Sequence, residues 1–282
     1  MTGIDTLNSA WEDYLYNLER DGSLTVIQLT DTHLLANHHN ELLGVPTCAS
    51  LQAVLNLVTE NHPVIDAMLV TGDMSQDGSF ESYQRLANYL KPINSPSFWI
   101  PGNHDAPTEL AKISINKTYG IKQIISPFWQ IIMLDSQVVG TVGGEINGDE
   151  WSFLTNCLTE HPSLHTMVCL HHHPIPMDSR WIDTIGLKNG TELINTLMAY
   201  KQVKAVVWGH VHQVKEQACE HIQLFSAPST CVQFKPDSEQ FALDEQGPGY
   251  RWFQLHPSGE IESAVERVPA SLFKPDLRST GY

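Results

Sequence analysis

The stretch 24-LTVIQLTDTHLL-35 decides how this 282-residue chain is read, because an apolar run stops at two potential metal ligands, Asp31 and His33. Four later segments repeat the pattern, because in each an apolar run leads to Asp, Asn or His: 67-AMLVTGD-73, 97-SFWIPGNHD-105, 167-MVCLHHHP-174 and 203-VKAVVWGHVH-212. Short apolar runs bounded by Gly, Pro and polar residues are typical of buried strands. Ligands of open α/β sheets gather beyond the carboxyl ends of the strands. The clusters therefore predict a metal-binding rim.

Strand and helix signals alternate along the rest of the chain. Helices are predicted over 6–19, 48–60, 79–90, 149–159 and 189–199, and strands over 24–30, 66–71, 97–101, 122–126, 129–135, 165–170 and 203–208. The stretch 250-YRWFQLHPSGEIESAVERV-268 predicts an antiparallel hairpin around a Pro-Ser-Gly turn. Early βα units followed by antiparallel strands favour an α/β fold with a pair of mixed sheets between helices.

We expect one catalytic domain over residues 23–282, because the clusters are shared between both halves of the chain and a division would split the site. Residues 1–22 are predicted to be an N-terminal helical extension, whose apolar face packs on the domain or meets a partner. The sequence leaves the choice between a monomer and a homodimer open.

Composition limits the partners. Sixteen basic and 32 acidic residues give a formal charge of −16, which argues against a nucleic-acid-binding surface. Bound divalent cations would reverse the local sign for an anionic substrate. The N-terminus lacks an apolar signal-peptide core, and no stretch reaches the roughly 20 apolar residues that cross a membrane. The five cysteines form no close pair. We therefore expect a cytoplasmic protein with no membrane partner.

The residue types in the clusters suit divalent ions. Carboxylates bind hard or borderline cations, and imidazoles bind Zn, Fe, Mn or Ni. The Asp-x-His and His-x-His pairs are each weak signals alone, and their ordered occurrence at strand ends is what favours a metal site over unrelated buried turns. Asn103 can coordinate through a neutral oxygen and leave His104 free for proton transfer. Gly102 and Gly209 are expected to permit the tight turns that aim these side chains.

In their order, D-x-H, G-D, G-N-H-D, H and G-H-x-H, these motifs resemble the calcineurin-like metallophosphoesterases, which have a four-layer αββα sandwich and a dinuclear metal centre. The segments DTHLL, GDMSQDG, LHHHPIP, WGHVHQ and 228-PSTCVQFKP-236 further resemble the bacterial class III cyclic AMP phosphodiesterases. The resemblance implies two divalent ions per subunit, with Fe2+ or Mn2+ favoured over Zn2+ or Co2+. One ion would take Asp31, His33, Asp73 and His212; the other would take Asp73, Asn103, His171 and His210. His171 is favoured over His172 and His173, since the family usually places its ligand first after the strand.

The same resemblance implies hydrolysis of 3′,5′-cyclic AMP to 5′-AMP by a hydroxide between the ions, with His104 assisting the leaving group. The substrate would be held by His33, Asp73, Asn103, His104, His171 and His212. Asp77 or Asp105 is expected either to orient His104 or to cap a turn, because Gln76 stands where many relatives have a carboxylate. Gln233 and Lys235 either reach the substrate or belong to a strand and turn, and His38 and His39 lie in a loop able to overhang the site.

Two other functions compete with this reading. A phosphodiesterase for 2′,3′-cyclic nucleotides or glycerophosphodiesters would use the same ligands, because the ions grip phosphate and do not read the base. A non-catalytic scaffold with this fold would be expected to have lost ligands, and here every ligand position is filled.

Overall fold

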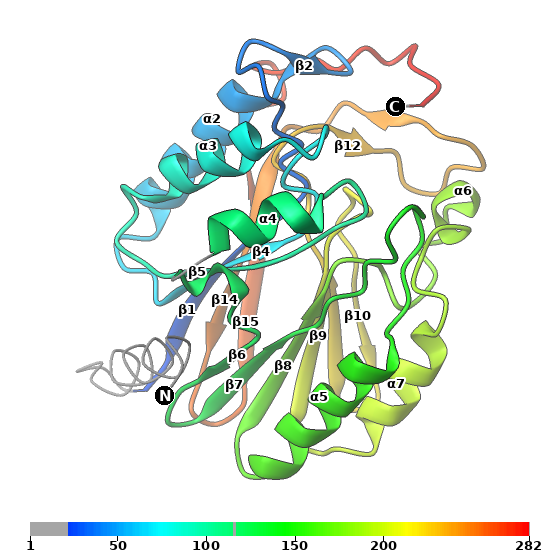
Figure 1. Cartoon of the computed structure of the whole chain (residues 1–282). Helices are drawn as coiled ribbons and strands as arrows, with labels where there is room; N and C mark the ends of the chain where they lie inside the picture. The colour runs from blue at the N-terminus through cyan, green and yellow to red at the C-terminus, as the bar shows by residue number, and fades with distance from the viewer. Residues whose placement is uncertain (1–21, 115–116, 282) are drawn as a thin grey trace.

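The computed structural model describes residues 22–114 and 117–281. Two β-sheets stack face to face, and helices cover the outer surface of each sheet (Figure 1). The predicted helix 6–19 lies outside the described residues.

The first sheet has the strand order β15–β14–β1–β4–β5. Its parallel part consists of β1 (Leu24–Leu29), β4 (Ala67–Thr71) and β5 (Ser97–Ile100). The hairpin of β14 (Gly249–Leu255) and β15 (Ile261–Arg267) adds two antiparallel strands, as the alternating sequence predicted. Helices α2 (Thr47–Asn61) and α3 (Phe80–Leu90) pack on its outer face, and α4 (Pro107–Ser114) contacts α3.

The second sheet has the order β10–β11–β9–β8–β7–β6. Its members are β10 (Glu216–Cys219), β11 (Ile222–Ser226), β9 (Val203–Trp208), β8 (His165–Leu170), β7 (Trp129–Met133) and β6 (Gln123–Ile125). The outer face is covered by α5 (Gly148–Glu160), whose first turn is capped by Asn147, and by α7 (Gly190–Met198). The loops contain α6 (Arg180–Asp183), η1 (Thr118–Gly120) and two short strand pairs, β2 (Glu41–Leu42) with β3 (Val45–Pro46) and β12 (Gln233–Phe234) with β13 (Leu243–Asp244).

Three apolar clusters fill the spaces between the four layers. One joins α2 and α3 to the first sheet around Leu51 and Leu86. Another joins α5 and α7 to the second sheet around Leu154 and Leu197. The third, which includes Phe98, lies between the two sheets. The predicted four-layer α/β sandwich is therefore confirmed.

Most predicted elements are confirmed to within about three residues of their ends. Two helices were missed, α4 and α6. Helix α4 carries a proline at its first position and Glu109 in its first turn, which are both helix-start signals. No helix within residues 22–114 and 117–281 has the length and apolar character needed to span a bilayer.

Parallel pairing places the candidate residues together. Strands β1, β4 and β5 run in one direction in the first sheet, as do β7, β8, β9 and β11 in the second. The loops that follow β1, β4, β5, β8 and β9 meet at one edge of the sandwich, so residues nearly 180 positions apart come into contact there.

Candidate metal centre

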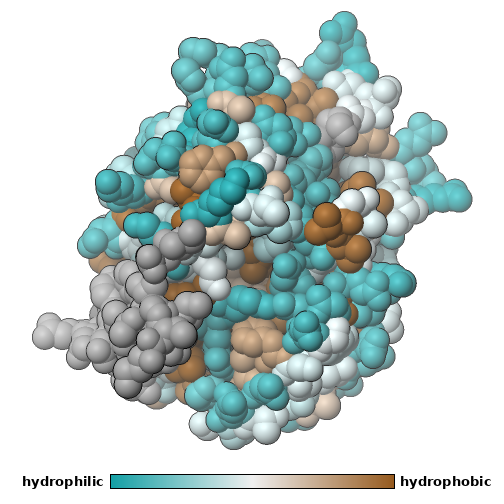
Figure 2. Space-filling model, in the orientation of Figure 1, coloured by the Kyte–Doolittle hydropathy of each residue, from teal (hydrophilic) through white to brown (hydrophobic). Residues whose placement is uncertain are grey.

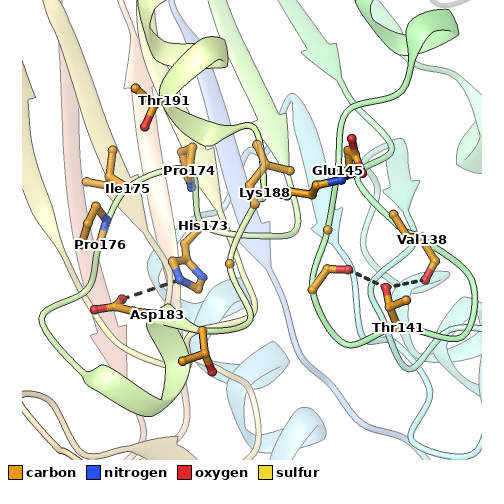
Figure 3. Close-up of a pocket in the computed structure, with 15 residues that line it drawn as sticks. Val138, Thr141, Glu145, His173, Pro174, Ile175, Pro176, Asp183, Lys188 and Thr191 are labelled. Carbon is orange, nitrogen blue, oxygen red and sulfur yellow. Dashed lines mark hydrogen bonds and ion pairs between the residues drawn. The ribbon is translucent and has the colours of Figure 1, made fainter.

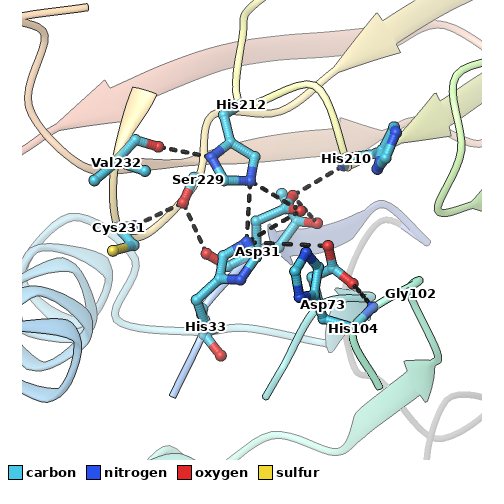
Figure 4. A network of polar contacts seen from close by, with 12 residues as sticks. Asp31, His33, Asp73, Gly102, His104, His210, His212, Ser229, Cys231 and Val232 are labelled. Carbon is cyan, nitrogen blue, oxygen red and sulfur yellow. Dashed lines mark hydrogen bonds and ion pairs between the residues drawn. The ribbon is translucent and has the colours of Figure 1, made fainter. Parts of the chain in front are cut away.

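The carboxylates of Asp31 and Asp73 lie among the imidazole rings of His33, His171 and His212 at this edge. Figure 4 shows both carboxylates with the rings of His33 and His212. His212 Nε2 is 3.2 Å from Asp31 Oδ1, and His171 Nε2 is 3.4 Å from Asp73 Oδ2. Ligand atoms of Asp31, His33 and His212 lie within 4.8 Å of one another, as do those of Asp31, Asp73 and His171. The structure therefore brings together the side chains that the sequence indicated.

Each of the three rings is anchored through its Nδ1 atom. This atom faces Gln76 Oε1 at 2.6 Å in His33, the carbonyl oxygen of Thr71 at 2.8 Å in His171, and the carbonyl oxygen of Val232 at 2.9 Å in His212. A ring nitrogen beside a carbonyl oxygen donates its hydrogen, so in the neutral ring Nε2 keeps its lone pair. Metal-binding histidines are usually oriented in this way. Gln76 was not assigned this part from the sequence.

The backbone at the centre is held in an uncommon conformation. The candidate ligands Asp31, His33, Asp73, His210 and His212 all have positive φ, between 44° and 67°. For residues with a Cβ atom this region costs of the order of 1–3 kcal/mol each, and such strain clusters at functional sites.

Two glycines allow the chain to approach the carboxylates closely. A Cβ atom on Gly102 would lie 2.2 Å from Asp73 Oδ1, and one on Gly209 would lie 2.0 Å from Thr30 Oγ1. Both glycines were expected to permit tight turns. In the structure, each position has no room for a side chain.

The electrostatics favour a cation. Burial alone would raise the pKa of Asp31 and of Asp73, but the neighbouring His212 and His171, respectively, lower both pKa values, so the carboxylates are ionised. Burial lowers the pKa of His33 to about 3 and that of His210 well below its usual value. His171 differs: burial opposes its charge, yet Asp73 raises its pKa to about 9.

The donor atoms fit a divalent metal. Among the described residues, the buried atoms Asp31 Oδ1 and Asp73 Oδ2 have no hydrogen-bond partner, which is costly for carboxylates away from water. His33 Nε2 and His212 Nε2 face each other at 3.1 Å, an unfavourable contact for two lone pairs. A cation bound by these nitrogen and oxygen atoms would remove both penalties, and the mixed donor set suits Fe, Mn, Zn or Co.

Asn103, His171 and His210 occupy the other side of the centre. Asn103 Oδ1 lies 3.2 Å from His171 Nε2. His210 is placed differently: its ring lies beside those of His171 and His172, with centroids 5.0 and 4.8 Å away, and its Nε2 faces the carbonyl oxygen of Ile185 at 3.1 Å. The structure therefore brings His171 to Asp73 and Asn103 to His171, and it places His210 against the histidines that follow β8.

The three consecutive histidines have separate surroundings. Both ring nitrogens of His172 face protein oxygens, Ser136 Oγ at 2.8 Å and the carbonyl oxygen of Val142 at 3.1 Å. His173 Nε2 lies 3.8 Å from Asp183 Oδ1. His171 is the one of the three whose ring nitrogen lies against Asp73.

His104 lies at the solvent side of the centre. Its backbone N–H donates to Asp73 Oδ1 at 2.8 Å, and its ring stands edge-on to that of His33 with centroids 5.1 Å apart. His104 is partly exposed, whereas His33 and Asp73 are buried. A partly exposed imidazole beside buried carboxylates is suitably placed for proton transfer.

The two acids near His104 stabilise turns. Asp105 accepts hydrogen bonds from the N–H groups of Gly102 at 2.8 Å and Ser75 at 3.0 Å, and burial with the nearby Asp73 raises its pKa to about 7. Asp77 accepts from the N–H of Ala36 at 2.9 Å. These contacts fix the loops around the centre.

The segment 228-PSTCVQFKP-236 supports the centre from behind. Ser229 Oγ donates to the carbonyl oxygen of Asp31 at 2.7 Å, and the ring of Phe234 stacks on that of His212 at 4.0 Å and 6°. Gln233 is buried and donates back to the carbonyl oxygen of Ser229 at 2.8 Å, whereas Lys235 is exposed. The motif thus positions His212, a part that its sequence alone did not reveal.

Comparison with known proteins agrees with this geometry. Residues 24–214 match the calcineurin-like phosphoesterase family. The chain therefore belongs to that family, and it is a metal-dependent phosphodiesterase.

Among its relatives are two proteins named 3′,5′-cyclic adenosine monophosphate phosphodiesterase CpdA. The one from Vibrio vulnificus is 40% identical over 93% of this chain and 96% of its own length, and the one from Pseudomonas aeruginosa is 38% identical over the same shares. In fold, the chain is similar to a purple acid phosphatase from yellow lupin, with a TM-score of 0.65 and 12% identity over 90% of this chain and 52% of that one.

Proposed function

We propose that this protein hydrolyses 3′,5′-cyclic AMP to 5′-AMP. The observation that carries the proposal is the buried pair of carboxylates, whose unpartnered oxygens face three imidazole rings anchored through their other nitrogens. Cations held at such a centre would bind a phosphate group. The names of the CpdA relatives, which match nearly the whole chain, point to the cyclic nucleotide as the phosphate ester.

The proposed ligands divide into two sets that share Asp73. Asp31, His33, Asp73 and His212 would hold one ion, and Asp73, Asn103, His171 and His210 would hold the other. Fe2+ and Mn2+ are the ions we favour, and Zn2+ and Co2+ also suit this donor set. Two bound ions would offset the negative charge of the phosphate and lower the pKa of a bound water molecule.

The protein's own residues complete the reaction. A rim of six side chains would contact and orient the phosphate: His33, Asp73, Asn103, His104, His171 and His212. A water oxygen would bond to phosphorus as the P–O bond to the 3′-oxygen breaks. His104, at the solvent side, would donate a proton from its imidazole to that leaving 3′-oxygen. The catalytic unit is proposed to comprise residues 23–282, with residues 1–22 as an extension outside the matched region.

A substrate panel tests the proposal. The Mn2+-loaded protein should release 5′-AMP from 3′,5′-cyclic AMP at a kcat/KM at least tenfold above that for 2′,3′-cyclic AMP and glycerophosphocholine, with a chelated sample as control. Faster hydrolysis of either alternative diester would keep the metal centre and overturn the substrate assignment.

A further inference from the structure

Residues 136–145, within the loop that joins β7 to α5, are held beside the metal centre at two places. Gln137 Nε2 donates to the carbonyl oxygens of Gly102 at 2.6 Å and Asp105 at 2.7 Å, which flank Asn103 and His104 in the chain. At the other end of the loop, the carbonyl oxygen of Val142 faces His172 Nε2 at 3.1 Å. The loop is therefore held beside the proposed proton donor.

This loop presents apolar side chains to solvent. Val138, Val139 and Val142 are 37%, 76% and 51% exposed, and they account for three of the eight large apolar residues exposed in the described parts of the chain. The face shown in Figure 2 is mostly hydrophilic, with a compact apolar patch right of its centre, where this loop runs in Figure 1. Exposed apolar residues gathered beside a catalytic centre indicate a binding surface.

A cavity of about 630 Å³ adjoins the loop (Figure 3). Val138 and Thr141 line it on one side, and Ile175 and Leu187 supply further apolar surface. His173, which is 3% exposed, also lines the cavity, and among the described residues its Nδ1 atom has no hydrogen-bond partner. Apolar and polar side chains share the walls of this cavity, and its volume lies in the usual range of sites for small organic ligands.

We propose that the valine loop and this cavity bind the purine nucleoside part of the substrate, an inference that rests on the proposed function. The metal centre would hold the phosphate, so a nucleoside attached to that phosphate must lie against the rim. The flat faces of a purine are apolar and would pack on Val138 and Val142. The hydroxyl oxygen of Thr141, whose hydrogen faces carbonyl oxygens of the loop, would accept a hydrogen bond from its polar edge. A neutral base would also not be repelled by a protein of charge −16.

The test is the double variant Val138→Ser/Val142→Ser, which keeps the backbone carbonyl that holds His172. In Mn2+-loaded protein, calorimetry would compare 5′-AMP with ribose 5-phosphate, which has the phosphate and the sugar but no base. We expect the affinity for 5′-AMP to fall about tenfold, as for loss of apolar contacts in a specificity pocket, and that for ribose 5-phosphate to stay within about twofold. Val64→Ser is the matched control, since Val64 is 48% exposed in the loop before β4, away from the rim.

Three results would overturn the inference. If native protein binds 5′-AMP no more tightly than ribose 5-phosphate, then it makes no favourable contact with the base. A double variant that binds 5′-AMP as native protein does would exclude the valines. An effect of Tyr119→Ala without an effect of the valine variant would place the base in the other apolar cavity, of about 590 Å³, lined by Trp99 and Tyr119. Failure to hydrolyse cyclic AMP, in contrast, would refute the proposed function while the binding comparison still reads out contact with the base.

Discussion

Replacing Gln76 by alanine should weaken metal binding although Gln76 is not a proposed ligand. Its Oε1 atom lies 2.6 Å from His33 Nδ1, and this contact fixes which nitrogen of the ring carries hydrogen and where Nε2 points. Without it, the ring can rotate, and Nδ1–H must find water in a site where His33 is buried. Loss of such an anchoring partner typically lowers metal affinity by about 10- to 100-fold, which corresponds to roughly 1.4–2.7 kcal/mol.

The assay is calorimetric titration of chelator-stripped protein with Mn2+. Gln76→Glu keeps an oxygen acceptor at the same distance along the side chain and should retain most of the affinity. Gln52→Ala is the matched control, because Gln52 is exposed on α2 and bonds only Asn56 among the described residues. Native Mn2+ affinity in Gln76→Ala would refute the argument that this amide orients His33.

Three further outcomes follow from the geometry. His104→Ala should keep both ions, measured by metal analysis, while turnover falls by about two to four orders of magnitude; loss of metal would make His104 a ligand. His171→Ala should lose metal, whereas His172→Ala should retain it because both nitrogens of His172 face other protein oxygens; equal losses would contradict the choice of His171. In ion-free protein, Asp73 raises the pKa of His171 to about 9 against the effect of burial. Below that pKa a proton on His171 competes with the cation, so Mn2+ affinity should rise up to about tenfold per pH unit from pH 6.5 and level off above pH 9. Calorimetry that shows no dependence of the affinity on pH would exclude His171 as a ligand.

The architecture could be predicted because its signals are local. Each apolar run that ends in Asp31, Asp73 or His171 has the length and composition of a buried strand, and parallel pairing brings such ends to one edge. The hairpin after residue 249 was also visible, since its polar and apolar residues alternate around a Pro-Ser-Gly turn.

The supporting contacts could not be predicted because they depend on long-range geometry. Nothing in the sequence near Gln76 shows that its amide faces His33, and the stacking of Phe234 on His212 requires two loops to meet. The positive φ angles of Asp31 and His212 are equally hidden, since neither residue type favours that conformation strongly enough to be read from sequence. These contacts come from the folded chain as a whole.

Metal stoichiometry measured together with turnover tests the central claim most directly. Chelator-stripped protein would be titrated with Mn2+ while bound metal and 5′-AMP release from 3′,5′-cyclic AMP are followed in the same samples. The account predicts two ions per chain at saturation, with activity rising as the second ion binds. Full activity in chelator, or saturation at one ion per chain with full activity, would contradict it.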